Sequence, residues 1–306
     1  MRRGLLIANP SASRFTGANF RRVRDVLSES FDLEVDWPHD AGETQSRSRE
    51  AAVDGFAAVF AMGGDGVVHH AANGLVGTAT ALGIIPSGTT NVLARIIGLP
   101  SKPHRAAAAQ VELSPVPTRL ALIEPLDGSA PMYATFAVGV GFDAAVVELA
   151  ERRPHSKVSL GGLHFATTAV SRLLSEWRSR VANLRVDCDG DRMDAVALLA
   201  QVHRPYTYFG RVPLHITSAP VVGMAAAAAG NLEIHRAGEM LGRAVLHRSF
   251  PDRLGMKVWT GFQELVVEAD PAAPYQADGE LLGITSGVKI TPAEDAILVL
   301  RADSQS

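Results

Sequence analysis

The segment Gly63-Gly64-Asp65-Gly66 lies between an apolar run and a segment whose apolar residues recur at helical spacing. Glycines at such a position let the backbone come close to a ligand and adopt positive φ. A helix that begins here offers N–H groups and a partial positive charge, which together favour phosphate. Asp65 would repel phosphate unless a cation lay between them, so the pairing indicates Mg²⁺. A tight turn with Asp65 as the helix N-cap explains the same residues without a ligand.

A second glycine-containing turn, Pro86-Ser87-Gly88-Thr89-Thr90, also follows an apolar run and precedes an expected helix at Asn91. Thr89 and Asn91 would offer a hydroxyl and an amide to a phosphate or a ribose. Helix capping by Thr90 or Asn91 explains the turn without a ligand. Two such turns at one edge of a sheet are a much more specific signal than one.

Two carboxylates flank a glycine in Asp278-Gly279-Glu280. If this segment is extended, Asp278 and Glu280 share a face, because side chains alternate along a strand. One carboxylate would then act as a general base, and the other would orient it or hold a metal. Because Asp-Gly is also a strong hairpin signal, a simple turn is the alternative interpretation.

The elements that position the first two turns alternate between strand and helix. Strands are expected at Gly4–Ala8, Leu33–Trp37, Ala57–Met62 and Ala81–Ile85, and helices near Phe20–Leu27 and at Thr44–Val53, Val67–Leu75 and Asn91–Ile97, with Thr44 as a helix N-cap. This alternation predicts a parallel, doubly wound, Rossmann-like sheet. Ligands bind beyond the carboxyl ends of such strands, where Asn9, Gly63–Gly66 and Gly88–Thr90 fall.

The pattern changes near Val116, beyond which strand-like runs and turns dominate apart from a helical stretch at Gly161–Arg180. The predicted domains are therefore an α/β domain at 1–116 and a mainly antiparallel domain at 117–306. The last strand, Ala296–Arg301, would pair in either domain, and packing of the extreme C-terminus back on the first domain is one of these two possibilities.

Composition narrows the class of protein. A formal net charge of −3 over 306 residues gives no large basic surface, so nucleic acid is not an expected partner. The single cysteine, Cys188, excludes an intramolecular disulfide, fits a reducing cytoplasm, and is expected to be a structural thiol. No signal peptide or transmembrane span is predicted, so the protein would meet lipid from the water side.

Taken in order, four motifs resemble the diacylglycerol kinase catalytic family, which includes soluble bacterial diacylglycerol kinases, bacterial lipid kinases and sphingosine kinases. The motifs are Asn9-Pro10, Gly63-Gly64-Asp65-Gly66, Pro86-Ser87-Gly88-Thr89-Thr90-Asn91 and Asp278-Gly279-Glu280. Asn73-Gly74-Leu75 and Gly139-Val140-Gly141-Phe142-Asp143 fit the same family.

This resemblance implies an α/β nucleotide-binding domain, a β-sandwich domain and an active site between them. It implies an ATP site lined by Asn9, Thr44, Gly63, Gly64, Asp65, Gly66, Gly88 and Thr89. Asp65 would act through Mg²⁺ or its waters, and Asp278 and Glu280 would supply the base. The implied reaction transfers the γ-phosphoryl group of ATP to a hydroxyl of diacylglycerol or a related lipid at the membrane surface, which the protein reaches transiently.

The chain departs from the family pattern at several positions. Val67 replaces a usual threonine, His70 a common glutamate, and Val92 a frequent aspartate. His69 is expected to face solvent and His70 to face the cleft. The family's acidic, Mg²⁺-binding turn corresponds to Ala225–Asn231, which has no carboxylate, so that metal site is expected to be absent. The basic segment Glu148–Arg180 is either a membrane-docking helix or a solvated helix that covers the sandwich.

Two alternative functions remain open. An NAD kinase-like phosphotransferase would use the same glycine tetrad on a soluble acceptor, although the second turn and Asp278-Gly279-Glu280 argue against it. A nucleotide-binding regulatory protein that has lost catalysis would explain Val67, His70 and Val92, although the retained carboxylates argue against it. Neither the lipid acceptor nor the oligomeric state follows from the sequence.

Overall fold

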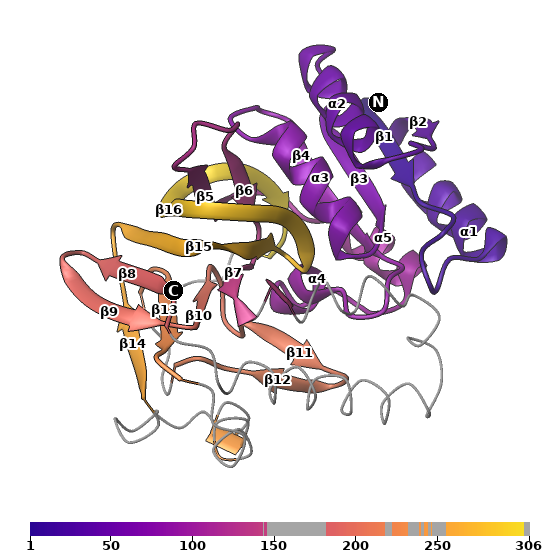
Figure 1. Cartoon of the computed structure of the whole chain (residues 1–306). Coiled ribbons are helices and arrows are strands. Elements are labelled where there is room, and N and C mark those ends of the chain that lie inside the picture. The colour runs from indigo at the N-terminus through magenta and orange to yellow at the C-terminus, as the bar shows by residue number, and fades with distance from the viewer. Residues whose placement is uncertain are drawn as a thin grey trace. The chain divides into compact units, whose positions relative to one another are not determined.

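The computed structural model describes residues 1–142, 144–145, 182–217, 222–231, 239, 242–243, 246 and 255–302 (Figure 1). The chain divides into two compact units. Unit 1 is Met1–Leu120 together with Ala293–Ser306, and unit 2 is Ala121–Pro292. Strands β5 (Pro115–Pro125) and β16 (Glu280–Leu300) each contribute residues to both units.

Unit 1 contains a parallel sheet in the order β2-β1-β3-β4, to which the end of β16 adds in parallel through Val299 opposite Leu82. The four N-terminal strands are β1 (Arg2–Ala8), β2 (Phe31–Asp36), β3 (Ala58–Gly63) and β4 (Ala81–Pro86). The strand order reverses direction between β1 and β3. The carboxyl edge at this point is therefore a topological switch point, where open α/β sheets bind ligands.

Five helices of unit 1 follow these strands (Figure 1), namely α1 (Gly17–Ser28), α2 (Ala41–Val53), α3 (Asp65–Leu75), α4 (Val92–Ile96) and α5 (Pro103–Val111). Leu6, Phe60 and Met62 share a buried cluster with residues of α1 and α5. Their strand neighbours Leu5 and Val59 are equally buried and point to the other face, because side chains alternate along a strand. Both faces of the sheet are therefore covered, which explains the uninterrupted apolar runs in the sequence.

Helix α2 begins at Ala41, three residues earlier than the sequence analysis expected. The prediction that Thr44 is the N-cap is wrong. Asp40 caps the helix instead, because its carboxylate accepts a hydrogen bond from the backbone N–H of Glu43 at 2.8 Å. Thr44 lies within the first turn.

Helix α3 packs between α2 and the strands β3 and β4. A Cβ atom on Gly74 would lie 2.4 Å from the carbonyl oxygen of Gln45, so glycine permits this close helix contact. The prediction that His69 faces solvent is wrong, since its exposed fraction is 0%. His69 is buried because α3 is covered on more than one side, and its ring meets that of His70 edge-on with centroids 4.9 Å apart.

Unit 2 is strand-rich and mainly antiparallel, with β14, β13, β10, β7, β15 and β16 as successive neighbours. The hairpin β8–β9 pairs with β15, and β6 pairs with β5. The bounds are β6 (Met132–Ala134), β7 (Ala137–Gly141), β8 (Leu184–Cys188), β9 (Asp191–Ala195), β10 (Ala197–Gln201), β13 (Ala225–Ala229), β14 (Met256–Thr260) and β15 (Leu265–Ala277), with a separate pair β11 (Thr207–Phe209) and β12 (Val212–Leu214).

Side chains from most of these strands meet in one apolar core, which includes Val138, Val186, Leu198 and Cys188. Burial, followed by the nearby carboxylates of Asp189, Asp191 and Asp187, raises the pKa of the Cys188 thiol to about 12. The thiol therefore remains protonated near neutral pH, where it packs as a small apolar group.

The predicted organisation, an α/β part followed by a mainly antiparallel strand-rich part, is confirmed. Ala225–Ala229, the start of the stretch compared with an acidic turn, forms the buried strand β13. The predicted helix Gly161–Arg180, the basic segment Glu148–Arg180 and Asp143 lie outside the described residues. None of the helices in the described part of the chain is long and apolar enough to cross a bilayer.

Candidate functional site

Three loops meet at the carboxyl edge of the sheet in unit 1: residues 9–16 after β1, the tight turn 63–66 from the end of β3 into α3, and 87–91 after β4. The backbone N–H of Arg14 donates to the carbonyl of Ser87 at 2.9 Å, and its guanidinium donates to the carbonyl of Thr89 at 3.3 Å. The hydroxyls of Ser13 and Thr89 are 2.9 Å apart. Because β3 lies between β1 and β4, the first loop reaches across the end of β3 to the third.

Different structural causes explain why glycine occupies each of these positions. A Cβ on Gly63 would lie 2.5 Å from Cγ2 of Val67, and a Cβ on Gly88 would lie 2.4 Å from the Cα of Gly64. A Cβ on Gly64 would meet Gly88 at 3.5 Å, an ordinary contact, and the Gly64 backbone has φ −90°. Packing and conformation therefore require glycine at positions 63 and 88 but not at 64, where the N-cap preference for glycine and space for a ligand close to the backbone are the remaining reasons.

Gly64 is also the N-cap of α3 and makes no side-chain cap. The first N–H groups of a helix have no acceptor within it, and the peptide dipoles give this end a partial positive charge. The arrangement can thus receive a phosphate group at a position where no Cβ obstructs it.

Polar side chains connect the second and third loops. Asp65 accepts a hydrogen bond from the backbone N–H of Val92 at 2.6 Å, so it caps α4 and not its own helix. Asn91 adopts φ 50°, and its amide exchanges hydrogen bonds of 2.9 and 2.8 Å with the backbone of Gly88. The amide expected to reach a phosphate or ribose is therefore engaged with the turn itself, which it holds rigid.

The eight residues expected to line an ATP site lie on four segments of unit 1. Asn9, Gly63, Gly64, Asp65, Gly66, Gly88 and Thr89 lie on the three loops or at their ends. Thr44 lies on α2, is 6% exposed, and donates its hydroxyl to the carbonyl of Asp40 at 3.0 Å. Asn9 accepts from the N–H of Ser11 at 2.8 Å, which shapes the start of the first loop.

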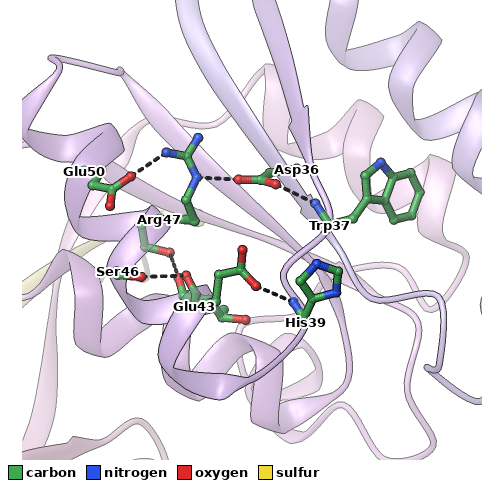
Figure 2. A network of polar contacts seen from close by, with 9 residues as sticks. Asp36, Trp37, His39, Glu43, Ser46, Arg47 and Glu50 are labelled. Carbon is green, nitrogen blue, oxygen red and sulfur yellow. Dashed lines mark hydrogen bonds and ion pairs between the residues drawn. The ribbon is translucent and has the colours of Figure 1, made fainter.

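A fourth loop, after β2, is held by charged side chains of α2, as Figure 2 shows. Asp36 accepts from the backbone N–H of Trp37 at 2.8 Å and from the Arg47 guanidinium, which also contacts Glu50. The hydrogen bond with Asp36, followed by that with Glu50, raises the pKa of Arg47, so this group stays charged.

Sequence reasoning missed this network, as well as the contacts of Ser13 and Arg14. The spacing of Arg47 and Glu50, three residues apart on a predicted helix, was a usable signal for their ion pair. No comparable signal indicates that the loop after β1 folds back over β3, because that contact depends on the strand order.

Asp65 was expected to bind Mg²⁺. Among the described residues, no group of three or more histidine, cysteine or acidic side chains is arranged to hold a metal ion. Mg²⁺ commonly binds through one or two carboxylates together with substrate phosphates and waters. The residues present would fit that mode, with Asp65 as the protein carboxylate beside a phosphate bound at Gly64.

In unit 2, Asp278-Gly279 forms a two-residue hairpin turn between β15 and β16. Ala277 pairs with Glu280, and Asp278 and Gly279 have φ of 55° and 83°. These values suit a type I′ turn, which Asp-Gly favours. The segment is therefore not extended at Asp278, and strand alternation does not place Asp278 and Glu280 on one face.

The two carboxylates have different surroundings. Asp278 is 2% exposed and accepts hydrogen bonds from the backbone N–H groups of Thr135, Phe136 and Ala137 at 2.7, 2.8 and 3.1 Å. These donors stabilise its negative charge and fix the turn. Glu280, the first residue of β16, is half-buried.

The N-terminal part of the chain is similar to known lipid kinases. Residues 3–122 match the diacylglycerol kinase catalytic domain. A protein named diacylglycerol kinase from Mycobacterium tuberculosis (strain ATCC 25618 / H37Rv) is 39% identical over 122 residues, which are 39% of each chain. A probable lipid kinase, YegS-like, from Chromohalobacter salexigens is 37% identical over 98 residues, 31% of this chain and 30% of that protein. The matched part thus spans less than two fifths of these relatives.

The similarity of the fold extends over more of the chain than the similarity of the sequence. The crystal structure of a diacylglycerol kinase from Bacillus anthracis strain Sterne matches with a TM-score of 0.71, covering 100% of this chain and 98% of that one at 17% identity. At that identity the likeness establishes the fold. Over residues 3–122, the matched sequence, the motifs and the carboxyl-edge geometry of unit 1 are thus similar to the diacylglycerol kinase catalytic domain.

Proposed function

We propose that this protein transfers the γ-phosphoryl group of ATP to a hydroxyl of diacylglycerol or a related lipid. The observation that carries this proposal is Gly64, a glycine that neither packing nor φ requires, at a helix N-terminus on the switch point of the sheet. The match of residues 3–122 to a kinase catalytic domain supports the reaction class.

Unit 1 binds the nucleotide in this proposal. The N–H groups at the start of α3 and the loops with Asn9, Gly88 and Thr89 receive the phosphates, and Asp65 holds Mg²⁺ directly or through its waters. When bound, Mg²⁺ neutralises phosphate charge as it develops. Thr44 has the weakest support among these residues, because its hydroxyl already donates within α2.

Unit 2 activates the acceptor. Glu280 takes the proton of the lipid hydroxyl, whose oxygen forms a bond to the γ-phosphorus as the bond to the ADP oxygen breaks. Asp278 is a positioning residue, since its carboxylate is buried and accepts three backbone hydrogen bonds. The half-buried Glu280 is the member of the pair better suited to contact a substrate. We further propose that the enzyme acts in the cytoplasm and contacts membranes only transiently.

Measuring ATP consumption under three conditions tests this function. We expect consumption to rise with vesicles that contain diacylglycerol, and not with the same vesicles lacking it. Stimulation by NAD in place of lipid would indicate the NAD kinase-like alternative. ATP binding without consumption under any condition would indicate a regulatory protein.

A further inference from the structure

Gln276 is a buried polar residue near the end of β15, two positions before the turn. It is 2% exposed, while its strand neighbours Tyr275 and Ala277 pack in the apolar core of unit 2. Because side chains alternate along a strand, Gln276 points to the opposite face of the sheet. The residue across from it in the β15–β7 ladder is Gly139, which has no side chain to fill that face.

Two hydrogen bonds fix the orientation of this amide. Its oxygen accepts from the backbone N–H of Gly279 at 2.9 Å, and its nitrogen donates to the Tyr206 hydroxyl oxygen at 3.4 Å. Tyr206 is itself buried, and its backbone N–H donates to the carbonyl of Leu214 at 3.0 Å. Gln276 therefore connects the β15–β16 turn to the segment that carries β11 and β12.

Stability is a weak reason for the bond to Gly279. Gly279 is exposed, so water could accept a hydrogen bond from its N–H in place of a side chain. Burying an amide costs desolvation, and exchanging a bond with water for a bond within the protein returns little net free energy. The bond has a larger effect on the direction of the Gly279 peptide group.

The direction of this peptide group decides the form of the turn. Two-residue hairpin turns occur as types I′ and II′, which both have positive φ at the first residue and differ in the sign of φ at the second. Glycine accepts either sign, so Gly279 alone leaves both forms open. The observed φ of 55° at Asp278 and 83° at Gly279 is that of type I′. Conversion to type II′ would turn over the peptide group between them and break the bond to Gln276.

The form of the turn sets the starting direction of Glu280, which follows Gly279 directly and begins β16. On the other side of Gly279, the Asp278 carboxylate is already fixed by three backbone N–H groups. A general base must lie within hydrogen-bond reach of the proton that it accepts. Misplacement of a catalytic group by about 1 Å can lower a rate by about 100-fold.

We propose that Gln276 is a positioning residue for Glu280, because it selects the type I′ form of the turn, and that Tyr206 holds the Gln276 amide in the orientation which this requires. The inference rests on the proposed lipid kinase function and adds two residues to its acceptor-activating part. Both residues act on the rate of phosphoryl transfer and not on nucleotide binding, which the proposed function assigns to unit 1.

Three variants separate this role from a structural one. Gln276→Met keeps the size of the side chain and removes both hydrogen bonds. Tyr206→Phe removes only the hydroxyl that orients the amide. Thr285→Val is the matched control, because Thr285 is also buried, lies on β16, and accepts a hydrogen bond from a backbone N–H, that of Gly287 at 3.0 Å.

The first measurement is kcat and the KM for ATP, with diacylglycerol in mixed micelles, together with the Tm of each protein. Gln276→Met should lower kcat by about 10- to 100-fold and leave the KM for ATP within about 2-fold of the wild type. Tyr206→Phe should lower kcat by about 3- to 10-fold, the usual effect of one hydrogen bond. Thr285→Val should lower Tm and leave kcat unchanged.

A double-mutant cycle then shows whether Gln276 acts through Glu280. In the Glu280→Gln background, adding Gln276→Met should change kcat by no more than about 2-fold, because the base that Gln276 positions is gone. A general structural role would give the same fold-loss in both backgrounds. If Gln276→Met does not fold, Tyr206→Phe takes its place in the cycle, with the same expectation.

The inference is wrong if Gln276→Met and Tyr206→Phe are as active as the wild type, if either lowers kcat equally in both backgrounds, or if the loss appears in the KM for ATP. The wild type decides the proposed function separately. A wild type that phosphorylates no lipid refutes that function and this inference with it, whereas an active wild type with an equally active Gln276→Met refutes this inference alone.

Discussion

Replacing Gly64 by alanine tests the proposed phosphate site with little disturbance to the fold. The added Cβ would meet the Cα of Gly88 at 3.5 Å, an ordinary van der Waals contact, and φ −90° is allowed for alanine. Alanine is a poorer N-cap than glycine, but it also reduces the entropy of the unfolded chain, and the two effects are of opposite sign. We expect the free energy of unfolding to change by no more than about 0.5 kcal/mol, or about 2 °C in Tm.

The effect on ATP binding should be much larger. If the phosphate contacts the backbone N–H groups at the start of α3, the new methyl group occupies the space through which it approaches. Loss of two hydrogen bonds to a charged ligand, at about 1.5 kcal/mol or more each, corresponds to at least about 100-fold weaker binding. Gly64→Asp should weaken binding further, because it adds a negative charge beside the phosphates.

The assay is isothermal titration calorimetry with Mg-ATP, combined with thermal melting of each variant. Gly242→Ala is the control, because a Cβ there meets none of the described residues within 4 Å and Gly242 lies in unit 2. Gly88→Ala is expected to affect stability, unlike Gly64→Ala. Its Cβ would lie 2.4 Å from the Gly64 backbone, and this clash should destabilise the protein by about 1–3 kcal/mol. Wild-type ATP affinity in a folded Gly64→Ala protein would refute the reasoning.

Three further outcomes are expected. Asp278→Asn should lower the free energy of unfolding by about 1–3 kcal/mol in denaturant titrations, because an amide N–H₂ would face backbone N–H donors; an unchanged midpoint would contradict the anchoring role. Activity should vanish in EDTA and return with Mg²⁺, whereas activity that persists in EDTA would exclude a metal at Asp65. Because burial raises the pKa of Cys188 to about 12, the thiolate should be scarce at every pH below that value, so a thiol reagent at pH 8 should label the unfolded chain and spare the native one.

The sequence predicted the arrangement of unit 1 well because its signals are local. Strands β3 and β4 are buried on both faces and read as continuous apolar runs that end in glycine turns. The periodicity change near Val116 and turns such as Asp189-Gly190, which joins β8 to β9, likewise indicated the strand-rich part. The residues at which helices begin and end were less predictable. At the start of α2, for example, the N-cap is Asp40 and not Thr44.

The features that sequence could not supply are those that depend on neighbours distant in the chain. His69 is buried in the fold, where α3 contacts α2, β3 and β4, and nothing in the local pattern around His69 indicates that burial. The different surroundings of Asp278 and Glu280 depend on backbone N–H groups more than 140 residues away. Similarly, Gly64 and Gly63 are indistinguishable as letters, and the space around each Cβ separates them.

Transfer of ³²P from [γ-³²P]ATP into a mixed lipid extract, by the wild type and by Glu280→Gln, tests the central claim most directly. Glu280→Gln keeps the size of the side chain and removes its charge, and it should leave ATP affinity unchanged while lowering kcat by about 10²–10⁴. We predict that the wild type labels a lipid that carries a free hydroxyl, and that Glu280→Gln labels it far more slowly. Absence of label from every lipid with the wild type, or a near-normal rate with Glu280→Gln, would contradict the proposed reaction or its base, respectively.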